Sequence, residues 1–363
     1  MLKKFNELRT AKDVANFLDI DYKYLCFLLY GIKSETKYEQ VFIPKRKGGM
    51  REISIPCSRI KVLQYKLLKE LNDMYVPRKC VYGFVPERNA ILNAERHVNK
   101  QVILNIDLKD YFSQIHFGRI VGLLKCSTFG LGDEAAKTIA QIVCYKSKLP
   151  QGACTSPVLA NLVTYRLDNE LMKLASENHI TYTRYADDIT FSTTKKSFPR
   201  EITEYEDGKV KIGSKLKSIL DDQDFKVNLD KVHYRTKKER QEVTGLTVNE
   251  KINVRRSYLN ELRQMLFSCE KNGLFESAKK YLEVHKFEKQ DMYQLSIAKI
   301  TDEAQAEKVK GKIESWYKTV LRGKIDFLKQ VRGKNNGYYI KYAKKYNVTA
   351  ASGRLKKASS WIR

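Results

Sequence analysis

The stretch Tyr185-Ala186-Asp187-Asp188 decides the fold, because it lies between two short runs with the composition of β-strands. Residues 180–184 and 189–192 are rich in β-branched and aromatic side chains, which favour strands. The pattern predicts a β-hairpin with both aspartates at its tip. Because Asp is also common in turns, the pair taken alone could reflect turn chemistry only.

A third carboxylate gives this hairpin a chemical interpretation. Residues 102–106, Val-Ile-Leu-Asn-Ile, predict a buried strand, and Asp107 stands at its end. Three carboxylates at the ends of adjacent strands suit a pair of Mg²⁺ ions held roughly 3.5–4 Å apart, which activate an attacking oxygen and stabilise a leaving pyrophosphate. We therefore expect Asp107, Asp187 and Asp188 to be catalytic metal ligands. A catalytically idle scaffold would have no use for three mutually repelling carboxylates.

The chain is strongly basic. Its 363 residues include 68 Lys/Arg and 42 Asp/Glu, a net charge of +26. Residues 305–363 hold 16 Lys/Arg against 3 Asp/Glu, so half of the excess, +13, lies in this last stretch. Such a concentration of positive charge favours binding to nucleic-acid phosphates. Aromatic residues alternate with the basic ones there, so we expect nucleic-acid contacts from Lys324, Arg332 and Tyr342, with other aromatics in the core.

Cysteine usage and hydropathy bear on the compartment. The seven cysteines are scattered without C-x-x-C spacing, which argues against a disulfide framework or a zinc site and favours a reducing environment. The longest apolar stretch, Tyr24 to Ile32, is too short to span a bilayer, and the start of the chain lacks a signal-peptide core. We expect a cytoplasmic protein with no membrane partner.

Residue periodicity gives a coarse order of elements. Strands are predicted at 41–44, 51–56 and 102–107, helices at 10–32, 60–71, 156–175, 214–222 and 254–269, and a polar loop at 199–208. Because strands come first and helices last, the order favours an α+β body with a helical C-terminal appendage.

A basic hairpin is predicted near the N-terminus. Lys45 and Arg51 flank a Gly48-Gly49 turn between two predicted strands. Clusters of basic residues are commonly solvated surfaces. A mobile basic hairpin could also clamp the triphosphate of a nucleotide, because Arg makes bidentate contacts to phosphate. We expect Lys45 and Arg51 to bind nucleotide.

Further nucleotide-site candidates follow the predicted catalytic strand. Phe112 comes just after the strand bends, so its ring could lie under an incoming sugar with Tyr111 beside it, although such a pair taken alone would be core aromatics. Gln151 could hydrogen-bond a nucleotide and Gly152 would allow a close backbone approach, although the pair could be a plain loop. Lys231 could lie near the pyrophosphate.

Together these motifs resemble those of reverse transcriptases, and among them bacterial retron reverse transcriptases, over roughly Tyr38 to Tyr346. The matching segments, in the family's order, are 42–51, 82–84, 105–112, 149–157 and 182–192. The retron-like signatures are Asn93-Ala94 with His97, Val243-Thr244-Gly245, and Leu321-Arg322-Gly323-Lys324-Ile325. Cys154 stands where the family usually has Pro, and residues 268–312 match no family segment.

The resemblance implies a right-hand polymerase of the α+β class. Its expected parts are N-terminal helices and fingers at 1–101, palm at 102–115, fingers and palm helices at 116–150, palm with the catalytic hairpin and primer grip at 151–249, and a basic helical thumb at 250–363. It adds Leu108 to the metal site. It also implies nucleic-acid contacts from Asn93, His97, Val243, Thr244, Gly245, Arg255 and Arg256. For His97 the alternative is a structural histidine with satisfied hydrogen bonds.

The resemblance implies an RNA-directed DNA polymerase that uses two Mg²⁺ ions and dNTPs. Such an enzyme would copy a structured partner non-coding RNA, starting from a 2′-OH, into a branched RNA–DNA product (msDNA) used in anti-phage defence. A separate effector protein is expected, and a host ribonuclease H for template removal. One rival is a group II intron-like reverse transcriptase, against which the Val-Thr-Gly signature counts. The others are another defence-associated reverse transcriptase and a catalytically idle RNA-binding scaffold.

Overall fold

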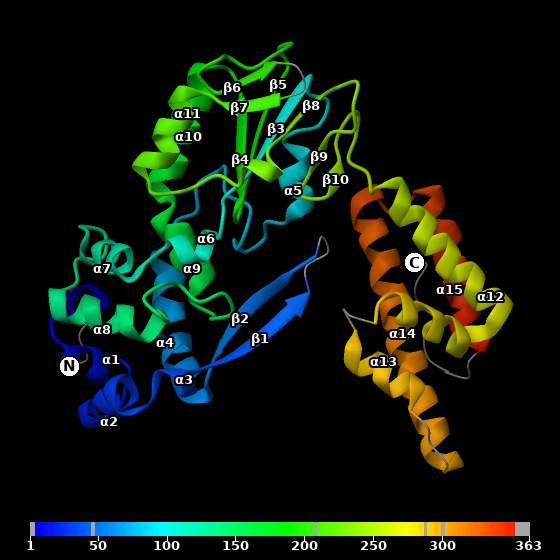
Figure 1. Cartoon of the computed structure of the whole chain (residues 1–363), viewed down its shortest axis with the longest axis horizontal. Coiled ribbons are helices and arrows are strands. Elements are labelled where there is room, and N and C mark those ends of the chain that lie inside the picture. The colour runs from blue at the N-terminus through cyan, green and yellow to red at the C-terminus, as the bar shows by residue number, and fades with distance from the viewer. Residues whose placement is uncertain (1–3, 45–47, 207–208, 287–288, 299–301, 353–363) are drawn as a thin grey trace. The chain divides into compact units, whose positions relative to one another are not determined.

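The computed structural model describes residues 4–44, 48–206, 209–286, 289–298 and 302–352 (Figure 1). The chain divides into two compact units, Met1–Thr244 and Gly245–Arg363. The first mixes helices with antiparallel strands and the second is mainly helical, which confirms the α+β prediction. None of the helices in these described ranges is both long and apolar enough to cross a bilayer.

The first unit begins with short helices rather than the single helix predicted over 10–32. Asp19, just beyond α1, has a left-handed φ of 52° that does not continue a helix. The Asp21 carboxylate then accepts hydrogen bonds from the backbone N–H groups of Lys23 and Tyr24 (2.8 and 3.1 Å), which starts α2. The elements are η1 (Phe5–Glu7), α1 (Ala11–Phe17), α2 (Tyr22–Cys26), η2 (Phe27–Gly31) and α3 (Ser34–Lys37).

An antiparallel hairpin and a long helix follow, as predicted. β1 (Tyr38–Pro44) pairs with β2 (Met50–Pro56) along its whole length. The helix α4 (Ser58–Met74) buries one face, and the apolar residues on it recur every four positions, at Leu63, Leu67 and Leu71.

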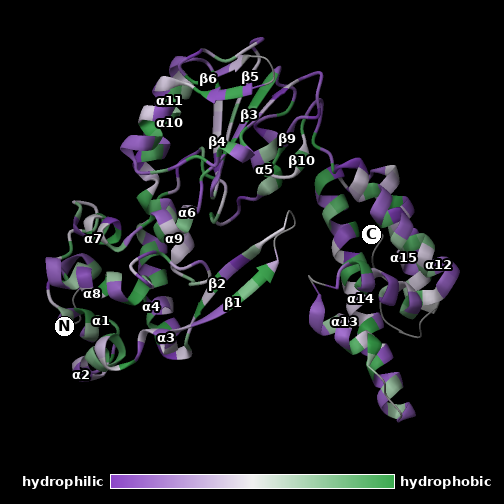
Figure 2. Cartoon of the chain, in the orientation of Figure 1, coloured by the Kyte–Doolittle hydropathy of each residue, from purple (hydrophilic) through white to green (hydrophobic). Residues whose placement is uncertain are grey.

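A four-stranded antiparallel sheet forms the centre of the first unit. Its strand order is β4 (Thr181–Tyr185), β5 (Asp188–Thr193), β3 (Val102–Asp107) and β8 (His233–Thr236). The apolar residues of β3 are fully buried, which explains its nearly continuous hydrophobic sequence. Figure 2 shows this as hydrophobic colouring in the middle of the sheet. The strand predicted at 102–107 and the hairpin predicted around residue 186 are both confirmed.

The first unit contains further helices, and one core runs through the unit. They are α5 (Ala90–Glu95), α6 (Tyr111–Gln114), α7 (Phe117–Lys125), α8 (Asp133–Val143), α9 (Ser156–Val163), α10 (Tyr165–Glu177), α11 (Ser214–Asp222) and η3 (Leu229–Lys231). Some lie on the sheet: α5 and α10 pack against β4, and α11 packs against α10. Others, such as α7 and α8, pack on α1, α4 and α9. The helix predicted at 156–175 is interrupted at Thr164, whose hydroxyl donates to the Ala160 carbonyl at 2.8 Å.

Two shorter features complete the first unit. The predicted loop at 199–208 is wrong in part, because β6 (Thr203–Glu206) lies within it and pairs with β7 (Lys209–Ile212). The unit boundary falls between Thr244 and Gly245, just after β9 (Glu242–Val243) and just before β10 (Leu246–Thr247). The division into fingers, palm and thumb stays a prediction.

The second unit is built on α12 (Arg256–Val284), α13 (Gln290–Ile297), α14 (Glu303–Arg332) and α15 (Gly337–Ser352). The helices α12, α14 and α15 pack on one another, and each carries hydrophilic and hydrophobic residues (Figure 2). The predicted helix at 254–269 is confirmed from Arg256 onward and continues to a kink at Gly273, whose φ is 76°. Helices therefore occupy most of the 268–312 stretch that no family segment matched.

Candidate active site

Three aspartates meet at one edge of the central sheet. In the β3–β5 ladder Asp107 pairs directly with Asp188. Asp187 occupies the turn between β4 and β5, and its backbone carbonyl accepts a hydrogen bond from the Leu108 N–H at 3.0 Å. The turn depends on Ala186, which has a left-handed φ of 57°. The three carboxylates that the sequence predicted to be neighbours are therefore neighbours in space.

The cluster is electrostatically strained. Desolvation by surrounding protein, followed by repulsion from Asp187 and Asp107, raises the pKa of Asp188 to about 7, although part of this side chain is open to solvent. Desolvation also raises the pKa of Asp187, and the charge of Asp107 adds to it. A carboxylate cluster with raised pKa values gains from a nearby cation, because the cation relieves the repulsion.

Lys231 supplies one such cation. Its Nζ donates to Oδ1 of Asp107 at 2.8 Å, and this hydrogen bond raises the pKa of Lys231. The side-chain amide of Asn228 lies 3.4 Å from the other Asp107 oxygen. Lys231 therefore lies beside Asp107, and its predicted place near the pyrophosphate stays a prediction.

A ready-made metal cage is not present. Across the described ranges, no group of three or more His, Cys, Asp or Glu side chains is gathered closely enough to hold a metal ion. Mg²⁺ usually binds one or two carboxylates together with substrate phosphates. Hard oxygen donors, mutual repulsion and open access make Asp107, Asp187 and Asp188 suitable for such a shared site.

The predicted nucleotide residues differ in their surroundings. Phe112 is half-buried, with its ring centroid 5.3 Å from Tyr111 and 6.0 Å from the partly exposed Phe84. Tyr111 is only 3% exposed, so it supports Phe112 and does not itself face a nucleotide. Arg51 is exposed, and its charge acts on Asp187 to lower the pKa, against the larger effect of desolvation. Lys45 lies outside the described residues.

The Gln151-Gly152 turn lies against a strand of this protein. The Gln151 carbonyl accepts a hydrogen bond from the Ser54 N–H at 2.8 Å. Gly152 has a φ of 131°, and a Cβ there would come within 2.8 Å of Ile53 and Ser54. The close approach that Gly152 permits is therefore made by β2. The half-buried Gln151 side chain stays a nucleotide-site prediction.

The Asn93 and His97 signature is buried, so its predicted direct contact with nucleic acid is wrong for this structure. The two ring nitrogens of His97 lie 2.7 Å from Ser192 Oγ and 2.7 Å from Thr183 Oγ1. The ring is fully buried, and desolvation lowers its pKa to about 3. The alternative of a structural histidine with satisfied hydrogen bonds fits these contacts. Asn93 is only 1% exposed.

The Val-Thr-Gly signature also lies in packed surroundings. Val243 is buried, and the Thr244 hydroxyl donates to the Ala90 carbonyl of α5 at 2.9 Å. Thr244 and Gly245 both have positive φ, 47° and 81°. The side chains of Val243 and Thr244 thus pack within the first unit. Of this signature, only Gly245 stays a candidate for a nucleic-acid contact.

In the second unit, three predicted nucleic-acid contacts have internal partners. Tyr342 is only 2% exposed, so the prediction that it stacks on a base is wrong. Lys324 forms an ion pair with Glu261 (2.8 Å), and Arg332 donates to Asn253 Oδ1 (2.6 Å). Both side chains therefore make contacts within the second unit. Arg255 and Arg256, at the start of α12, are exposed and stay candidates.

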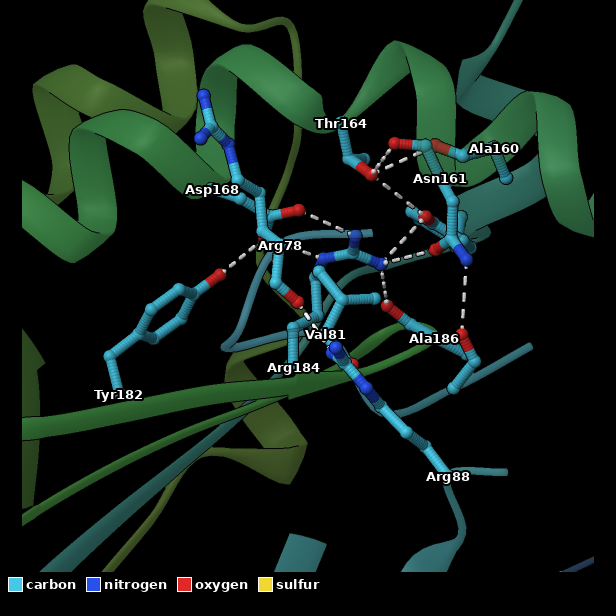
Figure 3. Close-up of polar contacts among 12 residues, drawn as sticks. Arg78, Val81, Arg88, Ala160, Asn161, Thr164, Asp168, Tyr182, Arg184 and Ala186 are labelled. Carbon is cyan, nitrogen blue, oxygen red and sulfur yellow. Dashed lines mark hydrogen bonds and ion pairs between the residues drawn. The ribbon is translucent and has the colours of Figure 1, made fainter. Parts of the chain in front are cut away.

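The sequence reasoning missed a buried ion pair behind the hairpin (Figure 3). Arg184 is fully buried and forms a bidentate pair with Asp168. Burial alone would lower the pKa of Arg184, but the charge of Asp168 overrides it and holds the pKa well above the usual range. A possible signal was Asp168 between Leu167 and Leu171, on the apolar face of a predicted helix, where a carboxylate needs a partner.

The fold and the site define a class. A four-stranded antiparallel sheet with three aspartates at one edge, followed in the chain by a helical unit, is the α+β arrangement of the right-hand polymerases. The chain belongs to the reverse transcriptase family, because its residues 43–248 match the family model described as Reverse transcriptase (RNA-dependent DNA polymerase).

Individual relatives agree with this family. The chain is 33% identical over 278 residues to Retron Mx65 reverse transcriptase of Myxococcus xanthus, a match covering 71% of this chain and 62% of the relative. It is 31% identical over 261 residues to Retron Mx162 reverse transcriptase of the same organism, covering 67% of this chain and 54% of the relative. The chain thus spans less than two thirds of these relatives. A solved telomerase from Candida albicans with an RNA fragment aligns with a TM-score of 0.40 and 10% identity, over 90% of this chain and 65% of the telomerase.

Proposed function

We propose that this chain is an RNA-directed DNA polymerase of the retron type. Membership of the reverse transcriptase family supports the chemistry, and similarity to proteins named retron reverse transcriptases supports the type. The observation that carries the proposal is the register of the central sheet, which pairs Asp107 with Asp188 while Asp187 occupies the adjoining turn.

Asp107, Asp187 and Asp188, with the carbonyl of Leu108, would hold two Mg²⁺ ions together with the triphosphate of a dNTP. When bound, Mg²⁺ activates the attacking oxygen of the primer and neutralises charge on the leaving pyrophosphate. Lys231 donates to Asp107 at 2.8 Å, so its ammonium is close enough to the catalytic edge to meet pyrophosphate oxygens.

The substrate nucleotide would be held by residues around this edge. Phe112, half-buried against Tyr111 and Phe84, has a ring that can limit the room at the sugar 2′ position. Gln151 and the exposed Arg51 would contact the base or sugar and the triphosphate, respectively, with Lys45 assisting Arg51. An aromatic ring under the sugar would leave little space for a 2′-OH, so this arrangement would favour a deoxyribonucleotide.

The nucleic-acid partner would be a structured non-coding RNA that is both template and primer. Synthesis from a 2′-OH would give a branched RNA–DNA product, msDNA, serving anti-phage defence with a separate effector protein and a host ribonuclease H. The retron names of the relatives support this reading. The net charge of +26 supports a polyanionic partner. Seven unpaired cysteines, all within the described ranges, suit a bacterial cytoplasm.

Asp187→Asn tests the catalytic assignment. We expect DNA synthesis on an RNA template with Mg²⁺ to fall by more than about a hundredfold, because even residues that only support a metal ligand contribute about 10–100-fold. RNA binding should change little. The matched control is Asp73→Asn, an exposed aspartate on α4. Activity of Asp187→Asn within about tenfold of the parent would contradict the two-metal assignment.

A further inference from the structure

Arg184 lies at the centre of a buried polar network immediately behind the catalytic turn (Figure 3). Its Nε and Nη2 donate to the two carboxylate oxygens of Asp168 at 2.8 and 2.7 Å. The Tyr182 hydroxyl donates to the same carboxylate at 2.7 Å. A two-point contact of this kind fixes the plane of the guanidinium and therefore the direction of its remaining nitrogen, Nη1.

Nη1 connects three separate parts of the candidate active site. It donates to the Ala186 carbonyl at 3.1 Å, to Asn161 Oδ1 at 3.1 Å and to the Tyr111 hydroxyl at 3.2 Å. Ala186 is the residue directly before Asp187, and Tyr111 is the residue directly before Phe112. Asn161 belongs to α9, the helix that follows the Gln151-Gly152 turn.

The catalytic turn needs such support. Ala186 adopts the left-handed conformation, which L-residues other than Gly rarely adopt without help from their surroundings. On another side the turn meets Gly83, where an added Cβ would lie 2.3 Å from the Ala186 nitrogen. The Asn161 amide donates to the Gly83 carbonyl at 3.0 Å, so the same network also holds this neighbour.

We propose that Arg184 is a positioning residue for the metal-binding carboxylates. Through Asp168 it is fixed to α10, and through Nη1 it holds the Ala186 carbonyl, which sets the turn that carries Asp187. The turn is also hydrogen-bonded to the residue after Asp107, because the Leu108 N–H donates to the Asp187 carbonyl at 3.0 Å. The role in catalysis rests on the proposed polymerase function, whereas the role in ordering the turn does not.

Arg184→Lys separates the charge of this side chain from its hydrogen-bond geometry. Lysine keeps a positive charge beside Asp168, but its single ammonium cannot pair with both carboxylate oxygens and also reach the Ala186 carbonyl. The matched control is Arg9→Lys, because Arg9 Nη1 also donates to three backbone carbonyls (2.9, 3.1 and 3.0 Å). They belong to Asn6 and Leu8 near η1 and to Gly130 between α7 and α8.

Two measurements read out the effect. Hydrogen exchange of the full chain, without metal or nucleic acid, follows the Leu108 amide against the amides of β3. For Arg184→Lys we expect exchange at Leu108 and at residues 185–188 to be roughly tenfold faster, the loss expected for about one charge-assisted hydrogen bond, with β3 unchanged. DNA synthesis on an RNA template should need roughly tenfold more Mg²⁺ for half-saturation. Arg9→Lys should change neither.

The outcomes are distinguishable. Unchanged exchange at Leu108 in a folded Arg184→Lys protein overturns the inference, as does an equal change in Arg9→Lys. A parent protein that makes no DNA contradicts the proposed function, while the exchange experiment still decides the inference. If Arg184→Lys does not fold, Asn161→Ala replaces it, because it removes one Nη1 acceptor and the bond to Gly83. Unchanged exchange of the turn in that variant also overturns the inference.

Discussion

His97 makes the stability of the first unit depend on pH. The folded protein holds the ring neutral, because burial, aided by the charges of Lys100 and Arg96, lowers the His97 pKa from 6.5 to about 3. In the unfolded chain the ring takes up a proton below about pH 6.5. The stabilisation is therefore complete above the unfolded pKa and is lost as the pH falls from about 6.5 towards 3.

The magnitude follows from these two pKa values. At about pH 5 the unfolded chain has gained most of a proton at this ring and the folded chain almost none, which corresponds to a loss of roughly 2 kcal/mol in the free energy of unfolding relative to about pH 7.5. That loss is a large share of the roughly 10 kcal/mol that is typical of the free energy of unfolding of a folded domain.

Urea unfolding of the parent and of His97→Gln at both pH values measures this effect. Glutamine offers one donor and one acceptor to Ser192 and Thr183 but does not titrate. Far-ultraviolet circular dichroism follows both units. Tryptophan fluorescence does not report on the first unit, because neither tryptophan of the chain, Trp316 or Trp361, lies within Met1–Thr244. We expect the pH-dependent loss in the first-unit transition to shrink by about 2 kcal/mol in His97→Gln. Equal losses in both proteins would refute the reasoning.

Two further predictions concern the catalytic edge. Phe112→Ala should raise incorporation of rNTPs relative to dNTPs, if the ring limits room at the sugar; an unchanged ratio in a folded variant would assign Phe112 to packing with Tyr111 and Phe84. Asp188→Asn should raise the thermal stability of the Mg²⁺-free protein more at about pH 8 than at about pH 5. The reason is that desolvation and repulsion raise the Asp188 pKa from 3.8 to about 7, so the destabilisation grows as the pH rises from 3.8 and is complete above about 7. An equal gain at both pH values would contradict this.

The catalytic edge could be predicted from sequence because strand ends and alternation are local properties. β3 is apolar except at Asn105 up to Asp107, and the two strands around Ala186 are short and rich in β-branched residues, so their ends had to meet if they paired. The boundaries of helices were harder to predict from the sequence. The segment 10–32 has one apolar periodicity, but the left-handed Asp19 and the cap at Asp21 divide it.

The Arg184–Asp168 pair could not be predicted, because the relevant strand is covered on both faces. Tyr182, Thr183 and Arg184 are all buried in succession, since α10 packs on one side of β4 and α5 on the other. Period-two alternation then carries no information about which side chain points inward. The partner lies on a neighbouring element, and its identity depends on packing that the sequence does not express locally.

The predicted nucleic-acid contacts in residues 305–363 rested on composition, which does not show which side chains are exposed. An excess of Lys, Arg and Tyr describes the stretch as a whole, whereas binding depends on the face of each helix. Tyr342 is directed into the helical core, and Lys324 packs over Tyr258 while pairing with Glu261. The charge argument for a polyanionic partner does not depend on these particular side chains. Exposed basic residues outside the stretch, such as Arg255 and Arg256, stay candidates for nucleic-acid contacts.

Two of the three retron-like signatures, Asn93-Ala94 with His97 and Val243-Thr244-Gly245, are connected through α5. His97, just after this helix, bridges Thr183 on β4 and Ser192 on β5, the two strands that carry the catalytic turn. At the other end of α5, the Ala90 carbonyl accepts from Thr244, 154 residues later in the chain and the last residue of the first unit. Hydrogen bonds thus join the N-terminal end of α5 to Thr244 and the residue just after its C-terminal end to both hairpin strands. The signatures are therefore better understood as the support of the catalytic turn than as side chains that contact RNA.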